Sequence, residues 1–168
     1  MKKNLVLIGM PGSGKSTLGR ELAAMLHMML LDTDAMVEQS AGRPIPRIFA
    51  EDGEEAFRDM ETAQVKKAAA MEGVIIATGG GVILRPENMQ ALSASGIVMF
   101  RDRDLAEIMG CDLADRPLLS GDAGRIYELY HQRIHLYRQY ADHTFEGTGT
   151  AKQIAGRMAA IYRQECNL

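Results

Sequence analysis

Residues 5–16, LVLIGMPGSGKS, join a short apolar run to a glycine-rich turn. The run from Leu5 to Ile8 is typical of a buried strand in a parallel sheet. The turn matches the phosphate-loop spacing G-x-x-x-x-G-K-[ST], in which backbone amides and a helix N-terminus surround a phosphate. Apolar residues then recur at helical spacing, as Leu18, Leu22, Met25 and Leu26. A strand, a loop and a helix in this order predict a nucleotide site at the loop.

The loop residues predict which groups would contact a nucleoside triphosphate. The expected contacts are Gly12, Ser13, Gly14, Lys15, Ser16 and Thr17. Lys15 would lie on the β- and γ-phosphates, and the Ser16 hydroxyl would bind Mg²⁺. The alternative is an ordinary glycine-rich turn with a solvated lysine. It leaves unexplained why Lys15 and Ser16 open the helix together.

Composition limits the other classes of function. The chain has 168 residues, a formal charge of −3 and a pI near 5.8. This length is typical of one domain, and the charge, without a basic stripe, argues against nucleic-acid binding. The sequence shows no membrane segment and no leader-like apolar stretch, and Cys111 and Cys166 lie far apart. We therefore expect a reduced, cytoplasmic monomer whose partners are small molecules.

Apolar runs and helical patterns alternate along the rest of the chain. Further strands are predicted at 30–31, 74–77, 97–100 and 144–145, and helices at 35–40, 54–72, 86–92, 102–109 and 126–140. A capping box formed by Thr150 and Gln153 predicts the start of a last helix. Strands that alternate with helices predict an α/β fold, in which helices cover both faces of a parallel sheet.

Two aspartates, Asp32 and Asp34, follow the second predicted strand. Alternate residues of an extended segment share a face, so both carboxylates would project at the carboxyl end of the sheet, where ligands bind. Asp32, nearer the phosphate loop, could hold Mg²⁺ directly or through water, and Asp34 could orient or deprotonate a hydroxyl. Asp34 could equally serve only as a helix N-cap. The spacing leaves both roles open.

A second glycine-rich turn and a long polar loop are further candidates. Gly79, Gly80 and Gly81 directly follow the third predicted strand, and consecutive glycines imply a close approach of the backbone to a ligand or another segment. The polar segment at about 110–122 is long enough to be a lid. It carries Arg116, and an arginine in such a loop can close on phosphates and stabilise transferred charge.

The spacing around two more arginines does not decide whether they bind a ligand. Arg58 lies one helical turn from Glu54 and near Glu61, so spacing alone favours a surface salt bridge. Arg133 precedes Tyr137 by one turn, and this pattern is compatible with plain stacking on a helix face or with a ligand contact.

Taken together, these elements resemble the shikimate kinase family. The similarity runs in order along nearly the whole chain, through the phosphate loop, Asp32-Thr33-Asp34, Ile48-Phe49, Gly53-Glu54, Phe57-Arg58, Glu61, the triple glycine, Arg116-Pro117-Leu118-Leu119, and Arg133 with Tyr137 and Ala141-Asp142. Other small P-loop kinases share the phosphate loop and the lid without the middle elements.

The resemblance implies a fold and a reaction. The fold would be a P-loop NTPase of the nucleoside-monophosphate-kinase type, with a five-stranded parallel sheet in the order 2-3-1-4-5. Residues 1–168 would form one kinase domain, with a substrate-binding segment at about 33–61 and the lid at about 110–122. The reaction would transfer the γ-phosphoryl group of ATP, with Mg²⁺, to the 3-hydroxyl of shikimate.

The resemblance also assigns roles to individual residues. Asp34 would bind ring hydroxyls and could act as the base, with Lys15 and Arg116 as the other catalytic residues. Arg58 and Arg133 would clamp the carboxylate of shikimate. The triple glycine would line the acceptor site, with Gly80 contributing a backbone amide.

A departure from the family on the adenine side and two alternative functions remain. Many members carry an arginine on the adenine side, seven residues before the lid arginine, where this chain has Met109. Weak ATP binding with loose base selectivity is therefore expected. A gluconate or nucleoside-monophosphate kinase would keep Lys15, Ser16 and Arg116 but need different middle residues. A non-catalytic nucleotide-binding regulatory module is the third possibility, and retention of Lys15, Asp34 and Arg116 argues against it.

Overall fold

A single parallel sheet organises the computed structural model, which describes residues 3–110 and 123–168. Its strands are β1 (Asn4–Ile8), β2 (Met29–Asp32), β3 (Val74–Ala77), β4 (Gly96–Asp102) and β5 (His143–Glu146). The order across the sheet is β2-β3-β1-β4-β5, and all neighbouring strands are parallel. The expected fold class and strand order are confirmed.

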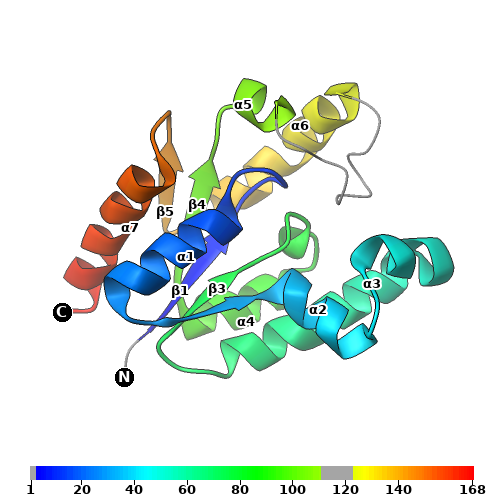
Figure 1. Cartoon of the computed structure of the whole chain (residues 1–168), viewed down its shortest axis with the longest axis horizontal. Coiled ribbons are helices and arrows are strands. Elements are labelled where there is room, and N and C mark those ends of the chain that lie inside the picture. Colours follow the sequence, from blue (N-terminus) through cyan, green and yellow to red (C-terminus); the bar gives the residue numbers. More distant parts are fainter. Residues whose placement is uncertain (1–2, 111–122) are drawn as a thin grey trace.

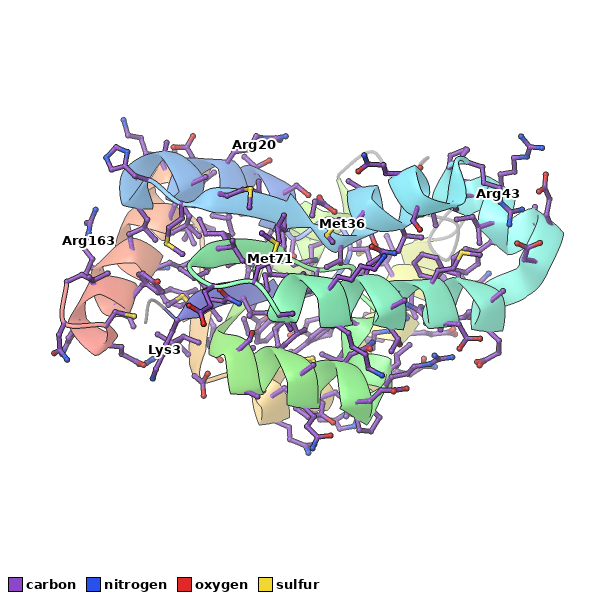
Figure 2. The ribbon with its side chains drawn as sticks, turned by 90° about the horizontal axis from the view of Figure 1, so that it is seen from below. Lys3, Arg20, Met36, Arg43, Met71 and Arg163 are labelled. Carbon is purple, nitrogen blue, oxygen red and sulfur yellow. The ribbon has the colours of Figure 1, made fainter. Side chains whose placement is uncertain are left out.

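Helices cover both faces of this sheet (Figures 1 and 2). They are α1 (Lys15–Leu26), α2 (Thr33–Ala41), α3 (Ile45–Ala69), α4 (Pro86–Ser95), α5 (Leu105–Met109), α6 (Ala123–Tyr140) and α7 (Ala151–Glu165), with a short 3₁₀ helix η1 (Val82–Leu84). Residues of α1 and α7 pack in one apolar core, and residues of α3, α4 and α6 pack in the other. In Figure 2, Arg43 at the α2–α3 turn and Arg163 on α7 mark opposite ends of the molecule.

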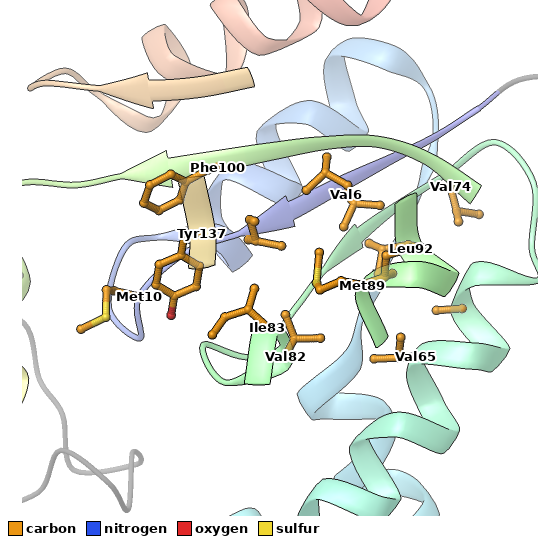
Figure 3. Packing of buried hydrophobic residues seen from close by; sticks show 14 of the residues in the cluster. Val6, Met10, Val65, Val74, Val82, Ile83, Met89, Leu92, Phe100 and Tyr137 are labelled. Atoms are coloured by element: carbon orange, nitrogen blue, oxygen red, sulfur yellow. The ribbon is translucent and has the colours of Figure 1, made fainter. Parts of the chain in front are cut away.

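The helices on both faces of the sheet explain why residues 5–8 of β1 are all apolar. Leu5 and Leu7 belong to the core beneath α1 and α7, whereas Val6 and Ile8 belong to the opposite core. Figure 3 shows Val6 among the side chains of the second core. Because both faces are covered, the strand has no solvent side and every residue is buried.

The helix predicted at 54–72 differs from the observed α3. The helix begins at Ile45, carries a proline in its first turn, and ends at Ala69. A proline in the first turn is compatible with a helix because its missing N–H would have no intrahelical partner there. Gly53, with φ 86° and ψ 173°, interrupts the helix, and the predicted start at Glu54 corresponds to its second part.

The helix predicted at 102–109 was placed too early in the chain. Strand β4 continues to Asp102, and α5 begins at Leu105 after Asp104, whose carboxylate accepts a 2.8 Å hydrogen bond from the Ala106 N–H. The capping box at Thr150 and Gln153 is confirmed. Arg116 and the predicted lid beyond Gly110 lie outside the described residues. Within the described ranges, no helix is both long and apolar enough to span a membrane.

Candidate active site

The phosphate loop connects β1 to α1 and is held by its own lysine. Lys15 Nζ donates to the carbonyl oxygens of Gly9 at 2.7 Å and Met10 at 2.8 Å, and lies 3.2 Å from Ser13 Oγ. The lysine side chain is therefore buried inside the turn, whereas Ser16, the next residue, is exposed. Lys15 thus opens α1 while its ammonium group turns back onto the loop that precedes the helix.

Asp32 links the phosphate loop to the start of α2. Its Oδ2 accepts a 2.9 Å hydrogen bond from Ser16 Oγ, and its Oδ1 accepts from the backbone N–H groups of Asp34 at 3.0 Å and Ala35 at 3.2 Å. Asp32 is thus the N-cap of α2, and the alternative that gave this role to Asp34 is wrong. The Asp34 carboxylate is not needed as that cap.

The donor set of Ser16 and Asp32 fits Mg²⁺. A hydroxyl and a carboxylate are hard oxygen ligands, and Mg²⁺ in nucleotide sites typically takes one or two protein oxygens and completes its shell with phosphates and water. Among the described residues, no group of three or more His, Cys, Asp or Glu side chains could hold a metal by itself. A magnesium ion at Ser16 and Asp32 would therefore depend on the nucleotide.

The triple glycine lies against two carboxylates. A Cβ at Gly79 would stand only 2.6 Å from Asp34 Oδ1 and 2.9 Å from Glu61 Oε1. Both distances are shorter than real Cβ contacts, so only glycine allows this approach. The Gly79 N–H donates to Thr33 Oγ1 at 3.3 Å. The close backbone approach predicted for this turn is confirmed, and it brings Asp34 and Glu61 together.

The other two glycines pack against the remaining parts of the site. A Cβ at Gly80 would lie 2.5 Å from Pro11 Cδ in the phosphate loop. A Cβ at Gly81 would overlap the guanidinium group of Arg58. The turn thus separates the phosphate loop from Arg58.

Arg58 and Glu61 form a buried pair. Arg58 is 5% exposed and Glu61 is fully buried, so the prediction of a surface salt bridge is wrong about the surface and right about the partners. Arg58 Nη1 donates to Glu61 Oε2 at 2.8 Å, and Nη2 donates to Glu54 Oε1 at 3.2 Å. Burial raises the pKa of Glu61 above 4.5, and the positive charges of Arg58 and then Arg133 oppose this shift.

Two polar atoms of this pair have no hydrogen-bond partner in the described part of the chain. Among the described residues, neither Arg58 Nε nor Glu61 Oε1 has a hydrogen bond, although both atoms are buried. Buried polar atoms are almost always paired in folded proteins. The exceptions therefore indicate a place where a ligand would complete the hydrogen bonds.

Arg133 and Tyr137 reach the same region from α6. Arg133 is 4% exposed, and its charge acts on Glu61. Tyr137 is fully buried, and its hydroxyl donates to the Gly80 carbonyl oxygen at 2.5 Å. The spacing of Arg133 and Tyr137 did not predict this hydrogen bond, because spacing along α6 carries no information about a contact with the glycine turn.

A cavity of about 240 Å³ adjoins the phosphate loop. Its lining residues are Ser13, Gly14, Thr17, Leu18, Arg101, Arg103, Gly149, Ala151 and Ile154. Arg103 donates from Nη1 to the Gly12 carbonyl at 2.9 Å and from Nε to Glu107 at 3.0 Å. Arg101 is buried and donates to the carbonyls of Phe145 and Gly147. Neither arginine could be picked out from the sequence, since they follow no motif.

A sequence model described as shikimate kinase matches residues 11–162. The chain belongs to the shikimate kinase family. A shikimate kinase of Psychromonas ingrahamii is 39% identical over 165 residues, which are 95% of this chain and 96% of the relative. One of Clostridium beijerinckii is 41% identical over 143 residues, 84% of each chain.

Solved structures of shikimate kinases share the fold. The enzyme from Acinetobacter baumannii in complex with shikimate has a TM-score of 0.93 at 32% identity, covering 97% of this chain and 94% of that one. The enzyme from Aquifex aeolicus has a TM-score of 0.84 at 29% identity, covering 98% of both chains. The fold is therefore the P-loop NTPase fold of shikimate kinases, and the protein is an ATP-dependent phosphotransferase.

Within this shikimate kinase fold, the predicted site residues fall into two connected groups. Lys15, Ser16 and Asp32 surround the phosphate loop. Asp34, Arg58, Glu61 and Arg133 surround the triple glycine on the other side. The turn at Gly80 touches Pro11 and so joins the two groups. A nucleotide on the loop and an acceptor beside Arg58 would thus be neighbours.

Proposed function

We propose that the protein transfers the γ-phosphoryl group of ATP to the 3-hydroxyl of shikimate. The observation that carries this acceptor is the buried Arg58, whose Nε has no hydrogen-bond partner among the described residues although its Nη atoms are held by Glu61 and Glu54. A carboxylate is the ligand that a guanidinium edge accepts best. The similar Acinetobacter baumannii enzyme was solved with shikimate, which supports the same acceptor here.

In this proposal Arg58 and Arg133 bind the carboxylate of the acceptor. Both side chains are buried, so their charges are little screened by water, and Glu61 between them offsets part of the repulsion of two cations. Gly79, Gly80 and Gly81 supply a surface without side chains against which a flat ring can lie. Gluconate and nucleoside monophosphates would have poorer shape complementarity to such a site.

Asp34 would act on the acceptor hydroxyl. Its carboxylate lies at the glycine turn, and it is free of the capping role that Asp32 performs. The hydroxyl oxygen would attack the γ-phosphorus, its proton would pass to Asp34, and the bond from the γ-phosphorus to the bridging oxygen would break to leave ADP.

The nucleotide side completes the proposed mechanism. The amides of Gly12, Ser13 and Gly14 would cradle the phosphates, Lys15 would compensate their charge, and Thr17 would lie beside them. Ser16 and Asp32 would hold Mg²⁺, which supplies positive charge to the phosphate oxygens when bound. Arg116 lies outside the described residues, so its action on the transferred group stays a prediction.

The proposal also includes a monomeric, cytoplasmic enzyme in which residues 1–168 form one kinase domain, with about 33–61 binding the acceptor and about 110–122 acting as the lid. The single sheet with its two apolar cores supports this domain assignment.

An acceptor screen tests the function. ADP release would be followed by a coupled assay with shikimate, quinate, gluconate and nucleoside monophosphates, and kcat/KM compared. We expect shikimate to exceed each of the others by at least about tenfold, the effect of one charged hydrogen bond. A Lys15→Met variant purified in the same way measures contaminating kinase activity. A preference for gluconate or a nucleotide would reject the acceptor, and ADP release with none of them would favour the regulatory module.

A further inference from the structure

Tyr137 connects α6 to the centre of the glycine turn. Its ring is fully buried and stacks on Phe100 with centroids 5.0 Å apart and an interplanar angle of 20°. In Figure 3 the hydroxyl points away from Phe100, on the side of Ile83. The hydroxyl donates to the Gly80 carbonyl oxygen at 2.5 Å. A packed aromatic ring thus fixes the position of one carbonyl in the turn.

The orientation of that carbonyl matters because of peptide geometry. The Gly80 carbonyl and the Gly81 N–H belong to one planar trans peptide, so they point in opposite directions. Glycines have the widest choice of backbone angles, and three in succession would sample many orientations without anchors. The turn has an anchor at each side, Thr33 Oγ1 for the Gly79 N–H and Tyr137 for the Gly80 carbonyl.

We propose that Tyr137 is a positioning residue for the acceptor, because its hydroxyl sets the direction of the Gly80–Gly81 peptide beside Arg58. This inference rests on the proposed function, since it concerns the same acceptor site. The two glycines of this peptide lie where Cβ atoms would collide with Pro11 and with the guanidinium group of Arg58, so a rotation would disturb the contacts with the phosphate loop and with Arg58. Arg133 lies one turn before Tyr137 on α6.

Tyr162 offers a matched control on the other face of the sheet. It is also fully buried, and its hydroxyl donates to a backbone carbonyl, that of Lys3, at 2.6 Å. It belongs to the core of α1 and α7, whereas Tyr137 belongs to the core on the other face of the sheet. Tyr162→Phe and Tyr137→Phe therefore remove the same kind of hydrogen bond, one remote from the site and one within it.

The test compares these two variants with the parent. Both should lose a similar amount of thermal stability. Only Tyr137→Phe should raise the KM for shikimate, by about three- to tenfold, the usual effect of one lost neutral hydrogen bond, with the KM for ATP within about twofold of the parent. Equal changes in the two variants, or an unchanged shikimate KM in Tyr137→Phe, would overturn the proposal.

A second measurement uses the parent protein alone and does not depend on how the variants fold. In NMR spectra, saturating shikimate should shift the Gly81 amide resonance, while the Tyr137 hydroxyl proton stays protected from exchange. A Gly81 amide that does not respond would overturn the positioning role. If the parent itself does not phosphorylate shikimate, the proposed function fails instead, and the two failures are distinguishable.

Discussion

Arg58 and Glu61 lie one turn apart on α3, and a 2.8 Å hydrogen bond joins Arg58 Nη1 to Glu61 Oε2 where both side chains are buried. The carboxylate holds one edge of the guanidinium group against the Gly81 backbone. The Nε atom remains without a hydrogen bond among the described residues. In the proposed function, this edge of the guanidinium group binds the carboxylate of the acceptor.

Changes at the two acceptor arginines should act on the acceptor and not on ATP. Arg58→Lys keeps a positive charge beside Glu61 but loses the planar fork, and Arg133→Ala removes its charge. Each should raise the KM for shikimate by about ten- to hundredfold, since a charged hydrogen bond contributes about 1.5 to 3 kcal/mol. Initial rates at varied shikimate and varied ATP would separate the two constants.

Arg85→Ala is the control for that experiment. Arg85 pairs with Glu55 and Asp59, which are both largely exposed, and it lies outside the glycine turn. Its removal should leave both KM values near those of the parent. If the Arg58 and Arg133 variants also kept the parent's KM for shikimate, the carboxylate clamp would be wrong.

The buried Glu61 should make stability fall as pH rises. Burial raises the pKa of Glu61 in the folded state above 4.5, so the folded protein holds this proton more tightly than the unfolded chain. The associated stability is present below about pH 4.5 and is lost as pH rises through the folded pKa. Glu61→Gln lacks this titration and can still accept from Arg58.

Urea denaturation at pH 5 and pH 7.5 would test this expectation. The unfolding free energy of Glu61→Gln minus that of the parent should be more positive at pH 7.5. Glu87→Gln, a change at an exposed glutamate paired with Lys66, is the comparison and should show little pH dependence. A difference for Glu61→Gln that stays constant, or that falls with pH, would contradict the raised pKa.

Asp34→Asn should lower kcat more than it raises the KM for shikimate. Asparagine keeps the size and the hydrogen-bonding capacity of the side chain but cannot accept the proton of the hydroxyl at transfer. Steady-state kinetics at saturating ATP would measure both constants. Unchanged turnover would exclude Asp34 as the base, and because Asp32 caps α2, helix stability could not account for a loss.

Asp32→Asn is the matched control for Asp34→Asn. Asparagine is a good N-cap, so α2 should persist, while the oxygen that faces Ser16 loses its charge. A higher Mg²⁺ concentration should then restore part of the activity that Asp32→Asn loses. It should have no effect on the activity of Asp34→Asn.

Met109→Arg should tighten ATP several-fold without altering the shikimate constant. Met109 is 41% exposed at the end of α5, and it is not among the residues that line the cavity beside the phosphate loop. An arginine there would regain a cation–π contact with the base, about 0.5 to 2 kcal/mol. Titrations of ATP, GTP and CTP would measure affinity and base preference in the parent and the variant.

The two arginines that line the cavity would explain an unchanged ATP affinity in Met109→Arg. Arg101 and Arg103 already place two guanidinium groups at the cavity, and Arg103 holds the Gly12 carbonyl. Strong ATP preference in the parent, or no gain in Met109→Arg, would mean that these or other residues hold the base. The departure from the family at Met109 would then be neutral.

The sequence alone determined the features that depend on near neighbours in the chain. The phosphate loop is a contiguous spacing, the strands and most helices follow from apolar periodicity, and the capping box at Thr150 lies within four residues. Gly79 to Gly81 could be expected to approach another segment because consecutive glycines have no other common reason to follow a buried strand. Even the strand order came from a resemblance that covers such local motifs.

The tertiary structure decided the features that depend on distant segments. The Tyr137–Gly80 hydrogen bond spans 57 residues of chain, and the Gly79–Thr33 bond spans 46. Spacing gave Arg58 two possible environments, and only the packing of α3 against the glycine turn buried it. The choice between Asp32 and Asp34 as the N-cap depended on where β2 ends and α2 begins. These outcomes depend on burial and on which strands lie side by side, and both are set by the whole core at once.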